Sequence, residues 1–190
     1  MDETKDSATA GTDPTRTADA GGWQPDVLGA GYQQQVLELG SDPDGEGQVA
    51  AVVVRRLHTE PVTGIVLYVH GFSDYFFQTE LADFFAGRAT AFYALDLRKS
   101  GRARRAGQTA HYVSDLAQYD VELDRTMDLI AAEHPGLPVT IVAHSTGGLI
   151  TALYLDKRRR AGRLAPIAGL VLNSPWFDLQ GKPILRSPVV

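Results

Sequence analysis

An apolar run that ends abruptly in His-Ser-Thr-Gly-Gly constrains this chain more than any other feature of its sequence. Residues 139–143 are mostly β-branched and have no polar face, which predicts a strand buried on both sides. A helical pattern over residues 149–157 follows almost at once. Ser145 is therefore predicted at a sharp turn from a buried strand into a helix.

The residues around this turn follow the small-x-Ser-x-Gly pattern that is typical of a nucleophile elbow, here with Ala143 and Gly147 as the small residues. A serine hydroxyl is a weak nucleophile and has to be exposed to both a base and a substrate. The N-terminus of the following helix presents free N–H groups that favour a developing negative charge. The alternative is an ordinary strand–turn–helix with a polar turn, because such short patterns also arise by chance.

Composition excludes several classes of site. The net charge of -5 argues against a general nucleic-acid-binding protein. The absence of cysteine excludes disulfides and thiolate metal sites. His58, His111 and His134 lack the spacing of metal ligands and are expected at the surface, so we expect neither a metal nor a cofactor. No apolar run approaches the roughly 20 residues of a transmembrane helix.

The order of predicted elements indicates the fold class. Strands are expected at residues 32–39, 48–57, 64–68, 89–97, 139–143 and 167–172, and helices at 78–88, 114–133 and 149–157, with Ser114 as a helix cap. Alternation of this kind predicts an α/β fold: a mainly parallel sheet with helices on both faces, preceded by an N-terminal hairpin. Ligands in such sheets bind at the carboxyl ends of the strands.

Both ends of the chain differ from the middle. Residues 1–22 hold little to bury and are expected to form a disordered tail, and they lack the features of a secretory signal, which favours a cytoplasmic location. Residues 23–178 are expected to form the core, and residues 179–190 the beginning of a lid or insertion.

Three motifs at strand ends together resemble the α/β-hydrolase superfamily. They are His70-Gly71-Phe72, then Asp96-Leu97-Arg98 with Gly101, and then residues 143–148. Within the superfamily the sequence is most similar to the monoacylglycerol lipase, lysophospholipase and serine-aminopeptidase-like branch, over residues 32–178. The resemblance implies a serine hydrolase of carboxylic esters that acts on a small acyl ester or lipid through an acyl-serine, without a cofactor.

The resemblance also implies a role for individual residues. Ser145 would be the nucleophile, and the backbone N–H groups of Phe72 and Thr146 would form the oxyanion hole, where one donor is typically worth about 10²–10³ in rate. The supporting residues would be His70, Gly71, His144 and Gly147.

One departure from the family pattern concerns the acid and the base. The family order is Ser, acid, His, but no histidine follows Ser145 in this chain, and the only acids there are Asp156 and Asp178. We therefore expect the chain to be the N-terminal part of a hydrolase, truncated after its sixth strand and without a working triad. The alternative is a non-catalytic α/β-hydrolase-like module that binds a ligand or a partner.

Other polar and aromatic residues allow two interpretations each. Asp96 is expected to brace the turn after its strand. Two segments are rich in basic residues: the first contains Arg98, Lys99, Arg102, Arg104 and Arg105, and the second is residues 157–160. Both are expected to be solvated surface. The functional alternative is weak contact with anionic lipid or with a phosphate-bearing substrate. The aromatic run at residues 75–77 is expected either to line an acyl pocket or to belong to the core.

Overall fold

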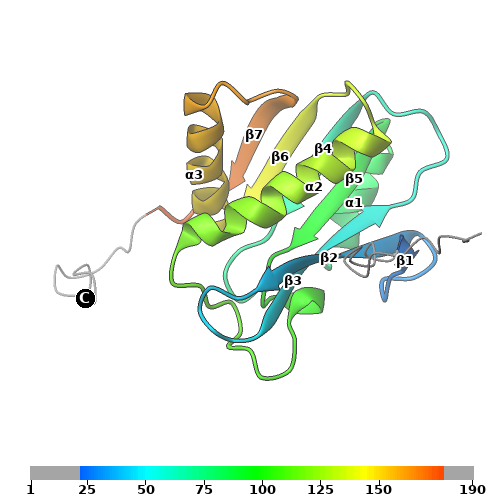
Figure 1. Cartoon of the computed structure of the whole chain (residues 1–190). Coiled ribbons are helices and arrows are strands. Elements are labelled where there is room, and N and C mark those ends of the chain that lie inside the picture. The colour runs from blue at the N-terminus through cyan, green and yellow to red at the C-terminus, as the bar shows by residue number, and fades with distance from the viewer. Residues whose placement is uncertain (1–21, 178–190) are drawn as a thin grey trace, which may run out of the picture.

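A computed structural model describes residues 22–177, which form a seven-stranded sheet with helices on both faces (Figure 1). The tail predicted at the N-terminus, apart from Gly22, and the lid predicted at residues 179–190 lie outside the described residues. The predicted fold class is confirmed.

The elements follow the predicted order, with one additional short strand at the start. The strands are β1 (Gln24–Pro25), β2 (Tyr32–Ser41), β3 (Gln48–Arg56), β4 (Gly64–Val69), β5 (Thr90–Asp96), β6 (Val139–His144) and β7 (Ile167–Asn173). The helices are α1 (Thr79–Ala86), α2 (Asp120–Glu133) and α3 (Thr146–Arg160), with short 3-10 turns η1 (Gly101–Ala103) and η2 (Leu116–Tyr119).

The sheet has the order β1-β2-β3-β5-β4-β6-β7. The N-terminal strands pair antiparallel as far as β3 with β5, and β5, β4, β6 and β7 are mutually parallel. After β4 the chain moves first to β5 on one side and then to β6 on the other. Strand order therefore reverses at β4, and a ligand site is expected at the carboxyl ends of the strands there.

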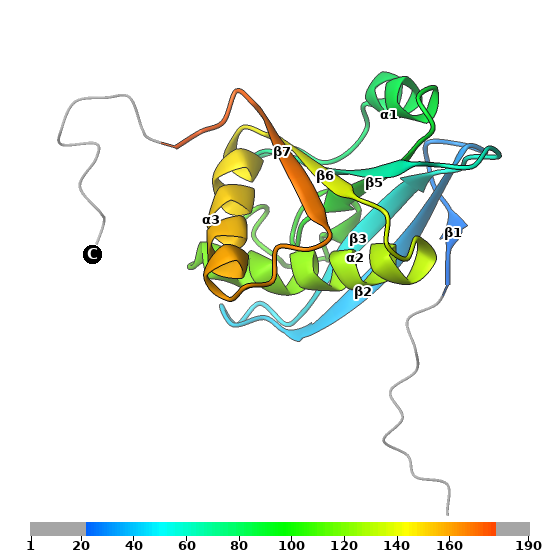
Figure 2. The same ribbon diagram turned by 90° about the horizontal axis from the view of Figure 1, so that it is seen from above.

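Two hydrophobic clusters fill the two faces of the sheet, and β4 contributes to both. Ile65, Leu67 and Val69 pack into the cluster that contains α2 and α3, whereas Val66 and Tyr68 pack into the cluster that contains α1. This alternation follows from the two-residue period of a strand. Figure 2 shows α1 on one side of the sheet and α2 and α3 on the other.

Two helices differ from the pattern predicted for them. The helix expected from residue 114 begins as the 3-10 turn η2, which Asp115 caps through the N–H of Ala117. The predicted cap Ser114 instead donates its hydroxyl to Asp44, in the turn between β2 and β3. The helix expected at residues 78–88 is shorter, α1 (Thr79–Ala86); it buries only Ala82 fully and leaves Phe84 51% exposed.

The expectation that the first basic segment is solvated surface is wrong for its central residues. Arg98 is 3% exposed and pairs with the buried Glu122 at 2.6 Å, and Lys99 is fully buried and pairs with Asp42 at 2.7 Å. Buried charges of this kind need partners, because an isolated charge loses its hydration. These cations therefore hold the loop after β5 in place and are not available to an anionic lipid.

Most of the other residues in the two basic segments also pair with carboxylates, whereas Arg104 donates to the backbone oxygen of Gln108. Arg102 contacts Asp26 and Asp96, and Arg105 contacts Glu38. The second basic segment, residues 157–160, is the last turn of α3, where cations interact favourably with the helix dipole. It is exposed, and its side chains pair with carboxylates at positions 120, 124 and 156.

Candidate active site

Ser145 lies at the turn between β6 and α3, in a backbone conformation that residues with a side chain seldom adopt. Its φ of 52° and ψ of -121° are strained for a non-glycine residue. Hydrogen bonds hold the turn on both sides: the Ser145 N–H donates to the Asn173 oxygen, and the Ser145 oxygen accepts from the N–H groups of Gly148 and Trp176. The strain is thus maintained by β7 and the segment after it.

Two glycines bring the Ser145 motif and the His70 motif into direct contact. A Cβ on Gly71 would lie 2.8 Å from the Ser145 Cβ. A Cβ on Gly147 would lie 2.7 Å from the Val69 oxygen and closer still to the His70 oxygen. Only glycine permits this approach between the end of β4 and the start of α3. The predicted supporting residues Gly71 and Gly147 are therefore placed at the junction of the two motifs.

His70 is buried, and both of its ring nitrogens are occupied. Its Nε2 accepts the Leu97 N–H at 3.1 Å, so the proton is on Nδ1, which donates to the Gly71 oxygen at 2.7 Å. Burial lowers the pKa of His70 and keeps the ring neutral. The side chain joins the end of β5 to the loop after β4 and has no nitrogen left for a serine.

Asp96 also holds this loop. Its Oδ1 accepts the N–H of Phe76, and its Oδ2 accepts from the backbone and the guanidinium of Arg102. The side chain is fully buried, so these bonds compensate for the lost hydration of its charge. The expectation that Asp96 braces the turn after its strand is confirmed, and the contact extends to the loop that carries Phe72.

Three hydrogen-bonding groups at the Ser145 turn have no partner in the described part of the chain. Within residues 22–177, no acceptor bonds the backbone N–H of Phe72 or of Thr146, and the Ser145 hydroxyl has no hydrogen-bond partner. Thr146 is the first residue of α3, where N–H groups have no partner within the helix and carry partial positive charge. The site can therefore receive an anionic oxygen next to a free hydroxyl.

Two further histidines lie near the site. The Nδ1 of His144, next to Ser145, lies 3.6 Å from the Asp74 carboxylate, and the side chain is half-buried. His111 was expected at the surface, but its ring centroid lies 5.6 Å from that of Phe72, and its Nδ1 hydrogen-bonds the Ser100 hydroxyl at 2.9 Å. Burial lowers the pKa of His111. No local pattern marks this residue, because its position depends on how the loop after β5 folds back.

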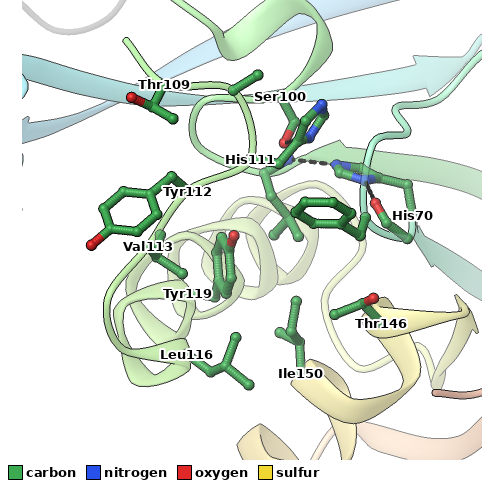
Figure 3. A pocket seen from close by; sticks show the side chains of 14 residues that line it. His70, Ser100, Thr109, His111, Tyr112, Val113, Leu116, Tyr119, Thr146 and Ile150 are labelled. Carbon is green, nitrogen blue, oxygen red and sulfur yellow. Dashed lines mark hydrogen bonds between the residues drawn. The ribbon is translucent and has the colours of Figure 1, made fainter. Parts of the chain in front are cut away.

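Two adjoining cavities open beside these residues. A cavity of about 390 Å³ lies between Phe72, the loop after β5 and the start of α3 (Figure 3). A second, of about 570 Å³, is lined by Phe72, Ser145, Thr146 and Trp176. The aromatic run at residues 75–77 lines neither: Phe76 belongs to the core, and the two residues beside it are exposed.

Other classes of site find no support in the described part of the chain. Among residues 22–177 there is no group of three or more His, Asp or Glu side chains that could hold a metal ion. No helix in these residues is long and apolar enough to cross a membrane. Of the two acids that follow the serine, Asp156 pairs with Arg159 and Arg160 on the exposed side of α3, and Asp178 lies outside the described residues.

Comparison with known proteins identifies relatives of this site and fold. The family model described as serine aminopeptidase, S33, matches residues 60–189. The monoacylglycerol lipase of Mycolicibacterium smegmatis is 31% identical over 97 residues, which are 50% of this chain and 33% of the lipase. The chain thus spans about a third of the length of this curated relative.

Solved structures share the fold at low sequence identity. A carboxyl esterase from Bacillus coagulans superposes with a TM-score of 0.61 at 19% identity, over 73% of this chain and 43% of the esterase. A soluble variant of the monoglyceride lipase from Saccharomyces cerevisiae gives a TM-score of 0.53 at 20% identity, over 80% and 44% of the two chains. Because the family model matches more than half of the sequence, this chain belongs to the serine aminopeptidase S33 family of the α/β-hydrolase superfamily.

Proposed function

We propose that this chain carries the nucleophile and the oxyanion hole of a serine hydrolase that acts on carboxylic esters of the monoacylglycerol lipase or lysophospholipase type. The observation that carries the proposal is Ser145 itself: a strained strand-to-helix turn presents a hydroxyl and two nearby N–H groups that have no partner among residues 22–177. Strain at such a turn is a feature of functional sites. The mycobacterial monoacylglycerol lipase that the chain resembles supports the choice of substrate class.

The reaction would proceed through an acyl-enzyme. The Ser145 oxygen attacks the ester carbonyl carbon, and the carbonyl oxygen takes the negative charge next to the N–H groups of Phe72 and Thr146. The C–O bond to the alcohol then breaks, and the alcohol leaves with the proton that the Ser145 hydroxyl has given up. Water next attacks the acyl-serine, which releases the carboxylic acid and restores the hydroxyl.

The proton acceptor is the part of this reaction that the described residues do not provide. Both nitrogens of His70 are bonded, His144 faces Asp74, and no histidine follows Ser145 in the sequence. The oxyanion hole and substrate binding alone typically leave a rate roughly 10³–10⁴-fold above that in water. That rate does not require a serine, so we propose slow ester cleavage for this chain by itself, to which attack by Ser145 adds a further slow contribution.

A non-catalytic binding module is the second candidate. It is favoured by one observation: within residues 22–177 the Ser145 hydroxyl has no base as a partner. A module of this kind would bind an ester or a carboxylic acid at the same N–H groups without cleaving it.

Hydrolysis of p-nitrophenyl butyrate separates the two candidates. The unsubstituted chain, a Ser145→Ala variant and a Ser73→Ala variant are compared; Ser73 is an exposed serine that also has a positive φ. The hydrolase proposal predicts a slow release of p-nitrophenol that is reduced in Ser145→Ala and unchanged in Ser73→Ala. Equal rates in all three proteins would leave the binding module as the better account.

A further inference from the structure

The cavity of about 390 Å³ beside the oxyanion loop has a mostly apolar wall built from several elements. Leu97 and Val113 come from the ends of the loop after β5, Leu116 and Tyr119 from η2, and Ile150 from α3. Figure 3 shows Val113, Leu116 and Tyr119 on the side of the cavity away from His70, with Ile150 beside Thr146. Its volume is at the small end of ligand pockets, which typically measure about 300–1,000 Å³.

The polar groups in this wall are uncharged. Burial raises the pKa of Tyr119 to about 12, and burial lowers the pKa of His111, so both side chains are neutral near pH 7. The buried His70 is neutral as well, because its Nε2 accepts a backbone N–H. A wall of this kind favours an aliphatic group over a charged one.

The position of the cavity relative to Ser145 indicates which part of an ester it would hold. Phe72 and Thr146 line both cavities, whereas Ser145 lines only the second, which it shares with Trp176. An ester whose carbonyl oxygen lies between the N–H groups of Phe72 and Thr146 has two substituents to place. The alcohol must depart and be replaced by water, so it requires the side on which Ser145 is accessible.

We propose that the cavity lined by Leu97, Val113, Leu116, Tyr119 and Ile150 is the acyl-chain pocket of this protein, selective for short to medium aliphatic chains. The assignment rests on the proposed function, because it places the ester carbonyl at the oxyanion hole. It adds that this cavity receives the acyl side of the carbonyl, and it limits the length of the acyl chain.

Phe72 and His111 lie next to each other in the lining of this pocket. Their rings are in contact, and His111 is held by the Ser100 hydroxyl and by a backbone hydrogen bond to the Lys99 oxygen. The buried ion pair of Lys99 with Asp42 anchors the same loop to the β2–β3 turn. The pocket wall is thus fixed before any ligand binds, which lowers the entropic cost of binding.

Binding of fatty acids, the reaction products, tests the assignment without requiring catalysis. Calorimetric titration of the unsubstituted chain with butanoate, hexanoate, octanoate and dodecanoate measures the affinity as the chain grows. Each methylene that enters the pocket should tighten binding up to about fourfold, which corresponds to about 0.8 kcal/mol. The gain should stop once the pocket is full.

Three variants locate this effect. Val113→Phe fills the pocket, so the affinity should no longer increase with the length of the fatty acid. Leu116→Ala enlarges the pocket, so the affinity should continue to increase up to longer fatty acids. Val121→Phe is the matched control, because Val121 is exposed on α2 and does not line the pocket. Circular dichroism melts verify that each variant is folded. If Val113→Phe does not fold, Leu116→Ala still tests the assignment, because it enlarges the pocket instead of filling it.

The outcomes separate this inference from the proposed function. The acyl-pocket assignment would be overturned if a folded Val113→Phe variant showed the same increase of affinity with chain length as the unsubstituted chain. It would also be overturned if the chain length at which the increase stops were the same in Leu116→Ala. A chain-length dependence that responds to both variants supports it, even if esters are not cleaved, in which case only the hydrolase proposal fails. Ester cleavage without any chain-length dependence would retain the hydrolase proposal and remove the pocket.

Discussion

Replacing Gly147 by alanine tests the close contact that joins the two motifs of the site. Gly147 is the second residue of α3, where intrinsic helix propensity favours alanine over glycine by about 1 kcal/mol. The structure predicts the opposite sign. The new Cβ would lie 2.7 Å from the Val69 oxygen and closer to the His70 oxygen, and both are backbone atoms that cannot rotate away.

The magnitude follows from the cost of overpacking. Forcing an additional methyl group into a filled site typically costs about 1–3 kcal/mol, which exceeds the gain from helix propensity. To relieve the contact, the start of α3 has to move away from the end of β4, and the N–H of Thr146 moves with it. Gly147→Ala should therefore lower both the stability of the fold and the rate at which Ser145 reacts.

Urea unfolding monitored by circular dichroism measures this change, with Gly64→Ala as the control. Gly64 is in β4, and its added Cβ would meet only the Pro138 oxygen at 3.8 Å, an ordinary contact. We expect Gly147→Ala to lose about 1–3 kcal/mol and Gly64→Ala to change much less. A Gly147→Ala variant as stable as the unsubstituted chain, or more stable, would refute the reasoning.

Three further predictions concern buried and paired charges. Glu122→Gln leaves the buried Arg98 without its counter-charge and should cost about 3–5 kcal/mol in urea unfolding, and a loss below 1 kcal/mol would contradict the burial of this pair. Hydrogen bonds from Thr109, and then from Lys99, lower the pKa of Glu46 to about 2. The contribution of Glu46 to the free energy of unfolding is therefore present above pH 4.5 and is lost as the pH falls toward 2. In Glu46→Gln the free energy of unfolding should fall less steeply over this pH range. Burial lowers the pKa of His70 below 6.5, so just below pH 6.5 the unfolded chain binds a proton at this residue and the folded chain does not. The free energy of unfolding should therefore decrease as the pH drops below 6.5. An NMR titration of the folded chain should find His70 still neutral at that pH.

Features that depend on neighbours in the sequence could be predicted from the sequence. The buried strand β6, the start of a helix just after Ser145, and the alternation of strands and helices all leave local patterns of apolar residues, small residues and turn formers. These patterns place Ser145, Phe72 and Thr146 at the carboxyl ends of strands. The structure brings all three together around one cavity.

Features that depend on distant partners could not be predicted in this way. Arg98 and Lys99 look like solvated surface because their acidic partners, Glu122 and Asp42, come from other elements of the fold. His111 lines the pocket only because the loop after β5 folds back over the oxyanion loop. A charge or a histidine carries no local sign of burial, so its environment becomes evident only once the sheet has assembled.

Covalent labelling with a fluorophosphonate tests the central claim most directly, because the reagent reports the reactivity of a serine hydroxyl next to an oxyanion hole. The 190-residue chain and its Ser145→Ala and Ser73→Ala variants are incubated with the reagent, followed by intact-mass and peptide analysis. We predict slow addition of a single label at Ser145, retained in Ser73→Ala and lost in Ser145→Ala. Equal labelling of all three proteins, or no label on Ser145 even after prolonged incubation at alkaline pH, would contradict the assignment of Ser145 as the nucleophile.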